Sequence, residues 1–123
     1  MINKGVQLWK IAKEIIPGGG MLISKQSERF LPEHWPAYFS KAKGCTVWDL
    51  DGRELIDMSI MGIGTNILGY GHPEVDEAVM RTIRAGNMST LNCPEEVYLA
   101  KKIIEHHPWS SMAKFTRGGG EAN

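Results

Sequence analysis

Residues 46–58 read TVWDLDGRELIDM, and this stretch decides the fold of the first half of the chain. Two runs with β-branched and aromatic residues flank Asp51-Gly52, a pair that favours a two-residue type I′ hairpin because such turns need positive φ. Lys43-Gly44 separates the first of these runs from an earlier one at 37–41. The pattern therefore predicts a three-stranded meander with strands at 37–41, 46–50 and 53–58.

Helices are predicted on both sides of this meander. Residues 6–16 have helical periodicity and are followed by a proline and three glycines that end the helix. A second helix opens at Pro73, and a third runs from Pro94 to His106 or His107. The first helix is expected to bury Leu8, Ile11, Ala12, Ile15 and Ile16.

A short strand is predicted at 112–116, running into Gly118, Gly119 and Gly120 where a further helix begins. Such a junction directs free backbone N–H groups and the positive end of a helix dipole at one point, which suits a phosphate. A flexible glycine linker is the alternative interpretation. We expect the chain to be the front part of a longer enzyme that stops inside its cofactor site.

The fold class expected from this order is an α+β N-terminal subdomain leading into the first strand of an α/β large domain. The subdomain consists of a helix, a three-stranded meander and two helices. The predicted division places the small-domain segment at 1–110 and the start of the large domain, which is truncated here, at 111–123.

Charge and cysteine content restrict the class of function. The chain has 14 basic and 14 acidic side chains, so neither nucleic acid nor a membrane surface is an expected partner. No apolar run reaches the roughly 18 residues of a transmembrane helix. Cys45 and Cys93 lack metal-ligand spacing and are too few for a disulfide scaffold. These observations predict reduced thiols in a cytoplasmic protein without a metal site.

Four stretches together resemble one family. They are 17–19 (PGG), 47–57 (VWDLDGRELID), 68–73 (LGYGHP) and 119–122 (GGEA). In this order and spacing the chain resembles the N-terminal part of class III, fold-type I aminotransferases that use pyridoxal 5'-phosphate (PLP). The branch that it resembles most contains glutamate-1-semialdehyde 2,1-aminomutase.

The resemblance implies that Gly118, Gly119 and Gly120 bind the PLP phosphate through backbone amides. This chain has three glycines where the family has at least one Ser or Thr, so a hydroxyl contact is missing. The family's cofactor-binding lysine, and the aspartate that pairs with the pyridine nitrogen, lie downstream. No catalytic residue is therefore assigned in this chain.

Substrate contacts are also implied by the resemblance. Ile63, Thr65 and Asn66 lie in a segment that lines the substrate side of the site, although they could instead pack under a neighbouring subunit. Lys25 stands where the aminomutases carry an arginine for the substrate carboxylate, or is a plain solvated lysine. Asn92 lies near the active site of the dimer partner, or caps the third helix.

Two functions from different classes follow. The first is the N-terminal portion of an aminotransferase or aminomutase, acting as a homodimer and transferring an amino group between an amine donor and a carbonyl acceptor. The second is a non-catalytic fragment that acts only through protein–protein contacts. A nucleotide-phosphate site is disfavoured because Glu121, and not a lysine, follows the glycines.

Overall fold

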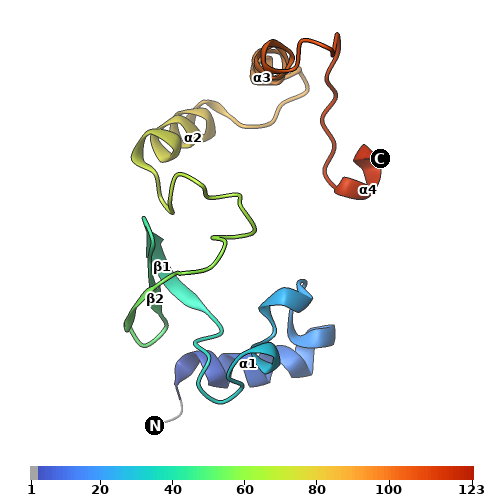
Figure 1. Ribbon diagram of the computed structural model, residues 1–123. Helices are drawn as coiled ribbons and strands as arrows, with labels where there is room; N and C mark the ends of the chain where they lie inside the picture. Colours follow the sequence, from blue (N-terminus) through green and yellow to red (C-terminus); the bar gives the residue numbers. More distant parts are fainter. Residues whose placement is uncertain (1–2) are drawn as a thin grey trace. The chain divides into compact units, whose positions relative to one another are not determined.

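The computed structural model describes residues 3–123, which fall into two compact units that divide between Glu77 and Ala78 (Figure 1). The elements in chain order are α1 (Lys4–Ile15), the 3₁₀ turns η1 (Pro17–Gly19), η2 (Ile23–Lys25) and η3 (Ser27–Arg29), β1 (Phe39–Lys43), β2 (Thr46–Asp49), β3 (Glu54–Ile56), α2 (Pro73–Ala85), α3 (Pro94–His106) and α4 (Gly119–Ala122). The predicted order of a helix, a meander and two helices is confirmed. The predicted domain boundary after residue 110 stays a prediction.

The meander is a three-stranded antiparallel sheet in the order β1-β2-β3. The pairing of Phe39 with Asp49 and of Lys41 with Trp48 leaves Ser40 as an extra residue, so β1 contains a bulge. The Ser40 hydroxyl donates to the carbonyl oxygens of Asp49 at 2.8 Å and Trp48 at 3.2 Å. The bulge is therefore held by a side chain where the ladder is interrupted.

The turn between β2 and β3 is longer than the predicted two-residue type I′ turn. Gly52 has a φ of 80°, but Asp51 does not have positive φ, because Met61 and Ile63 are the only non-glycine residues that do within 3–123. The Gly52 N–H donates to the Asp49 carbonyl at 3.1 Å, and the Asp49 N–H donates to the Arg53 carbonyl at 3.1 Å. This pattern is typical of a type I turn followed by a left-handed glycine.

Asp49 is the side chain that selects this turn. Its carboxylate is 4% exposed and accepts the N–H groups of Asp51 and Arg53, each at 2.9 Å, and the Arg53 Nε at 3.1 Å. Burial alone would raise the pKa of the Asp49 carboxyl. The backbone N–H groups and the guanidinium outweigh this effect and hold its pKa below the ordinary value. A buried charge is thus stabilised by the donors of the turn that it closes.

Helix α1 begins earlier than predicted because Asn3 caps it, accepting the Val6 N–H at 2.7 Å. The helix buries Val6, Trp9 and Ala12. The expected apolar face is wrong except for Ala12, since Leu8, Ile11 and Ile15 are 40%, 51% and 73% exposed. Ile16 follows the helix and is 43% exposed. The buried face of α1 is the one that contacts residues 17–38. Helical periodicity alone does not show which face this is.

Trp9 is the centre of this packing. Its indole N–H donates to the Glu28 carboxylate, with distances of 3.0 and 3.2 Å to the two oxygens, and Lys13 Nζ binds the same carboxylate at 2.8 Å. The Tyr38 ring lies 6.4 Å from the Trp9 ring. The backbone of Gly19 passes so close that an added Cβ would lie 2.6 Å from the indole. Trp9, together with Lys13 at Glu28, therefore attaches the irregular segment 17–38 to α1.

In the second unit, α3 buries no side chain, and neither does α2, which crosses the boundary between the two units.

The predicted strand at 112–116 is wrong, because within the described residues this segment pairs with no strand. A strand needs a neighbour for its backbone donors and acceptors. No helix in the described range is long and apolar enough to cross a membrane.

We predict that Gly19→Ala destabilises the chain by about 1–3 kcal/mol, the usual cost of overpacking. Gly19 has a φ of 75°, and its new Cβ would overlap the Trp9 ring. Gly20→Ala is the matched control, because Gly20 is extended with a φ of 178° and its Cβ would lie 3.9 Å from the same ring. Chemical denaturation followed by tryptophan fluorescence measures both. Equal stability of the two variants would contradict this packing.

Candidate functional site

The loop between β3 and α2 contains three of the predicted site residues, and its two ends are fastened together. The Tyr70 hydroxyl donates to Asp57 Oδ2 at 2.6 Å. Tyr70 also exchanges two backbone hydrogen bonds with Gly44, at 2.8 and 2.9 Å, and the Asp57 N–H donates to the Cys45 carbonyl at 2.8 Å. Both ends of the loop are thereby attached to the turn between β1 and β2.

The Asp57–Tyr70 pair is electrostatically coupled. Asp57 Oδ1 accepts the Ser59 hydroxyl at 2.6 Å and the Ser59 N–H at 2.8 Å. Hydrogen bonds from Ser59 and then Tyr70 lower the pKa of the Asp57 carboxyl. The bond to Asp57 raises the pKa of Tyr70 to about 12. Asp57, Ser59 and Tyr70 are not among the predicted site residues, although Asp57 and Tyr70 lie in the quoted family stretches.

Inside this loop the backbone makes a left-handed turn at residues 61–64. The φ values are 43° at Met61, 74° at Gly62, 61° at Ile63 and 76° at Gly64. The Gly64 N–H donates to the Ile60 carbonyl at 2.7 Å. Left-handed backbone costs about 1–2 kcal/mol for each residue with a Cβ. A β-branched residue such as Ile63 is a genuine outlier there.

The structure separates the three predicted loop residues by what they contact. Thr65 Oγ1 donates to the Gly62 carbonyl at 2.8 Å, and Asn66 Nδ2 donates to the Met61 carbonyl at 3.3 Å. Both polar side chains are thus engaged with the backbone of the left-handed turn. Ile63 and Thr65 are both exposed, and the Ile63 side chain, at 62% exposure, is the one of the three that forms no bond to this backbone.

Lys25 lies at the end of η2 and is exposed. Its amino group makes no hydrogen bond or ion pair with any residue in 3–123, and the structure records no contact between it and the left-handed turn. The predicted role at a substrate carboxylate therefore stays a prediction. An exposed ammonium without an ion-pair partner is available to bind an anion.

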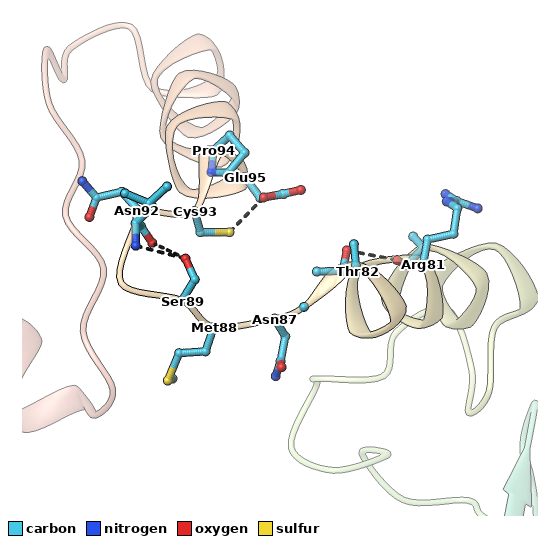
Figure 2. Close-up of a pocket in the computed structure, with 13 residues that line it drawn as sticks. Arg81, Thr82, Asn87, Met88, Ser89, Asn92, Cys93, Pro94 and Glu95 are labelled. Atoms are coloured by element: carbon cyan, nitrogen blue, oxygen red, sulfur yellow. Dashed lines mark hydrogen bonds between the residues drawn. The ribbon is translucent and has the colours of Figure 1, made fainter.

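Asn92 lines a pocket of about 560 Å³ between the end of α2 and the start of α3 (Figure 2). The residue that caps α3 is Cys93, so the alternative that Asn92 caps this helix is wrong. The Cys93 thiol donates to Glu95 Oε2 at 2.8 Å, and this bond lowers the pKa of the Glu95 carboxyl. The pocket is lined by Ala78, Arg81, Thr82, Ala85, Gly86, Asn87, Met88, Ser89, Leu91, Asn92, Cys93, Pro94 and Glu95.

Gly118, Gly119 and Gly120 lie at the amino end of α4, with Gly118 as the cap. A Cβ added at any of the three would meet no atom within 4 Å, and none of them has positive φ. Neither the backbone conformation nor the surroundings of these three positions therefore requires glycine. The Thr116 hydroxyl donates to the Gly118 carbonyl at 3.2 Å, and the Arg117 N–H donates to Glu121 Oε2 at 3.0 Å.

The open space around these glycines lets a ligand approach the first N–H groups of α4, as an anion bound at a helix terminus requires. The negative charge of Glu121 disfavours an anion at this position, because the Glu121 carboxylate lies at the same turn and binds the Arg117 N–H. Among residues 3–123, no group of three His, Cys, Asp or Glu side chains is placed to hold a metal ion.

Residues 31–123 match the family described as Aminotransferase class-III. The chain belongs to this family. It is 37% identical to glutamate-1-semialdehyde 2,1-aminomutase of Ignicoccus hospitalis, over 98% of this chain and 27% of the relative. It is 35% identical to the protein of the same name from Methanothermobacter thermautotrophicus, over 97% of this chain and 27% of the relative.

Two solved structures share the fold of this chain. One is the PLP internal aldimine form of the FumI protein from Sphingopyxis sp. MTA144, with a TM-score of 0.82 and 29% identity, over 97% of this chain and 28% of that chain. Another is an omega-transaminase from Sphaerobacter thermophilus, with a TM-score of 0.82 and 27% identity, over 98% of this chain and 26% of that chain. The chain thus spans roughly a quarter of the length of these relatives.

We predict that Tyr70 ionises at about pH 12, since the hydrogen bond to Asp57 favours its neutral form. The stabilisation from this bond is complete below the ordinary tyrosine pKa of 10.0 and is lost as the pH rises through about 12. Asp57→Asn should lower the pKa of Tyr70, because the negative charge is removed. Titration of the Tyr70 ring signal by NMR measures it, with Tyr70→Phe to assign the signal. An unchanged pKa in Asp57→Asn would contradict the coupling.

Proposed function

We propose that this chain forms the N-terminal portion of a PLP-dependent aminotransferase or aminomutase, which transfers an amino group between an amine donor and a carbonyl acceptor. The observation that carries the proposal is the family match over residues 31–123, which continues through the glycine turn. It is supported by relatives named as aminomutases and by the likeness to an omega-transaminase and a PLP-containing form of FumI.

The cofactor phosphate is proposed to bind at Gly118, Gly119 and Gly120. The fit is favourable in the backbone, because α4 begins here and no side chain fills the space around the three Cα atoms. It is less favourable in the side chains, because the Thr116 hydroxyl donates to a carbonyl and Glu121 adds a negative charge. PLP, when bound, supplies an electron sink for chemistry at the substrate's amino-bearing carbon.

The proposed roles of this chain's other residues are in binding and orientation. The Lys25 ammonium attracts a substrate carboxylate as a point charge, without the two parallel hydrogen bonds of an arginine. This difference favours an acceptor other than glutamate semialdehyde. Ile63 and Asn92 contribute contacts on the substrate side. No residue of this chain is proposed to move a proton in the reaction. The reason is that the family resemblance places the cofactor-binding lysine and the aspartate at the pyridine nitrogen downstream.

A second function is favoured by a separate observation. The apolar side chains of α2 and α3 are about half exposed, with Val75 at 47%, Ile83 at 52% and Val97 at 55%. Helices in folded proteins are stabilised mainly by burial of such faces. The alternative is therefore a non-catalytic fragment that acts through protein–protein contacts. In the complete enzyme the same faces would be covered by the large domain or by the second subunit of a homodimer.

The cytoplasm is the proposed compartment. Cys45 and Cys93 are both exposed and free. Exposed thiols that form no disulfide suit a reducing compartment.

The test is covalent trapping of the cofactor. Incubation with PLP, borohydride reduction and mass spectrometry should give no stoichiometric adduct at a single lysine of the 123-residue chain, because the resemblance places the cofactor-binding lysine downstream. The complete enzyme should give one adduct and should transfer an amino group from an amine donor. A complete enzyme that gives neither would contradict the proposed function. A specific adduct with turnover by the 123-residue chain would contradict the assignment of the catalytic residues.

We also predict the effect of side chains at the phosphate turn of the complete enzyme. Gly119→Val should weaken PLP binding tenfold or more, because the new side chain enters the space through which a phosphate approaches. Gly118→Thr should strengthen binding by roughly 1 kcal/mol through one added hydroxyl donor. Equilibrium binding of PLP to the apo-enzyme measures both, with Ala122→Val as the control. Wild-type affinity in Gly119→Val would show that the phosphate binds elsewhere.

A further inference from the structure

The turn between β2 and β3 contains a residue pair that is chemically labile by its composition. Asp51 is followed by Gly52, whereas every other aspartate of the chain is followed by a residue with a side chain. In an aspartyl–glycyl pair the glycine nitrogen can attack the carboxyl carbon of the aspartate side chain, because no Cβ hinders the approach. The space around Gly52 is open, since an added Cβ would meet no atom within 4 Å.

This reaction needs only water and conserves the composition of the chain. The Gly52 nitrogen bonds to Cγ of Asp51, and one oxygen of the protonated carboxyl group leaves as water with the amide proton. The resulting cyclic imide then takes up one water. Opening at Cγ restores aspartate, whereas opening at the main-chain carbonyl carbon gives isoaspartate, in which the main chain runs through Cγ. No oxidant, reductant or enzyme is required.

In the folded chain both reacting groups are bonded elsewhere. The Gly52 N–H donates to the Asp49 carbonyl at 3.1 Å, so the attacking nitrogen is engaged in the turn. The Asp51 N–H donates to Asp49 Oδ1 at 2.9 Å, which fixes the main chain before the reactive pair. The Asp51 carboxylate accepts the Lys4 N–H at 2.9 Å through Oδ2. Ring closure therefore requires that the turn bond break and that the carboxylate be freed from the Lys4 N–H.

The bond to Lys4 also joins two elements of the fold. Lys4 is the first residue of α1, and its N–H is one of those that have no partner inside a helix. Asp51 accepts this N–H from the meander. The Lys4 amino group adds a bond of 3.4 Å to the Leu50 carbonyl and an exposed ion pair of 4.0 Å with Asp51, which contributes little. The backbone N–H of Lys4 is thus the main link between α1 and the reactive carboxylate.

We propose that Asp51-Gly52 is a site of spontaneous aspartate isomerisation, and that binding of the Lys4 N–H at the start of α1 to the Asp51 carboxylate slows this reaction. Isoaspartate at residue 51 lengthens the main chain of the turn by one carbon and shortens the arm that carries the carboxylate by one carbon. Both changes move the acceptor away from the Lys4 N–H, so α1 loses this link to the meander. The reaction does not depend on the proposed amino-transfer function.

The lability of the site is tested on the 123-residue chain by incubation near neutral pH, digestion and mass spectrometry with electron-transfer fragmentation, which distinguishes isoaspartate from aspartate. In denaturant, isoaspartate should accumulate at residue 51 about tenfold faster than at any other aspartate, because only Asp51 precedes glycine. Without denaturant, the rate at residue 51 should be about tenfold lower, because opening of the turn must come first. Asp51→Glu should give no isomer at this position. Equal rates at all aspartates of the denatured chain, or equal rates at residue 51 with and without denaturant, would overturn the proposal.

The role of α1 is tested by two substitutions at Lys4. Lys4→Pro removes the N–H donor, and proline suits this position because it is the first of the helix and because Asn3 before it is extended, with a ψ of 151°. Lys4→Ala removes the amino group and keeps the N–H. Lys4→Pro should speed isomerisation of the folded chain about fivefold, as expected for the loss of one hydrogen bond. Lys4→Ala should leave the rate nearly unchanged. Equal rates in the two variants would overturn the protection by α1.

The consequence for α1 is tested on the isoaspartyl chain after its separation from the unmodified chain by ion-exchange chromatography. Amide hydrogen exchange of Lys4, measured by NMR, should be about fivefold faster because its acceptor is lost. Exchange of Val6 should change little, since its acceptor is Asn3. The Val6 amide also serves as the control that Lys4→Pro retains the helix. Unchanged exchange at Lys4 in the isoaspartyl chain, or equally accelerated exchange at Lys4 and Val6, would overturn the specific loss of this link.

Discussion

The hydrogen bond from Tyr70 to Asp57 is the interaction on which the candidate substrate loop depends. It joins residues on either side of a glycine-rich segment that has no regular structure of its own. The bond is short at 2.6 Å because its acceptor is a carboxylate, and bonds to charged groups are the stronger ones. Ser59 orients that carboxylate through two further bonds. The backbone pairing of Tyr70 with Gly44 then places the closed loop against the meander.

The meander is a suitable base because its own turn is stabilised by a buried charge. Asp49 accepts both turn N–H groups and the Arg53 side chain, so little freedom remains between β2 and β3. The Asp51 carboxylate also accepts the Lys4 N–H at 2.9 Å, which attaches α1 to the same turn. Removing one partner of a buried charge is costlier than the net value of the pair. The turn at 49–53 thus holds together the sheet to which both ends of the candidate loop are bonded, at Gly44 and Cys45.

The helices in the second half of the chain are not stabilised by burial of side chains within this chain. Helices α2 and α3 have good local signals, with acidic residues in the first turn and basic residues in the last. They bury no side chain, although their apolar residues are spaced for burial. Local signals are sufficient to define where these helices begin and end. Their stability in a complete protein must come from surfaces that cover them, which agrees with a chain that spans 27% of its relatives' length.

Much of the fold could be predicted from local patterns. Glycine and proline positions marked the ends of the helices, and the Asp51-Gly52 pair located the hairpin even though the turn type was wrong. The buried face of α1 could not be predicted, because Leu8 and Trp9 are both apolar and only the path of residues 17–38 decides which is covered. The strand expected at 112–116 failed for the same reason, since a ladder needs a partner that the local sequence does not identify.

The candidate site divides in the same way. The sequence by itself determined the family, the glycines at the start of α4 and the loop that carries Ile63, Thr65 and Asn66, because these depend on residue identity and spacing along the chain. Only the tertiary structure decided that Thr65 and Asn66 bind backbone carbonyls while the exposed Ile63 side chain forms no such bond, and that Cys93 caps α3 in place of Asn92. These distinctions depend on the direction in which each side chain leaves the backbone, which residue identity and spacing along the chain do not specify.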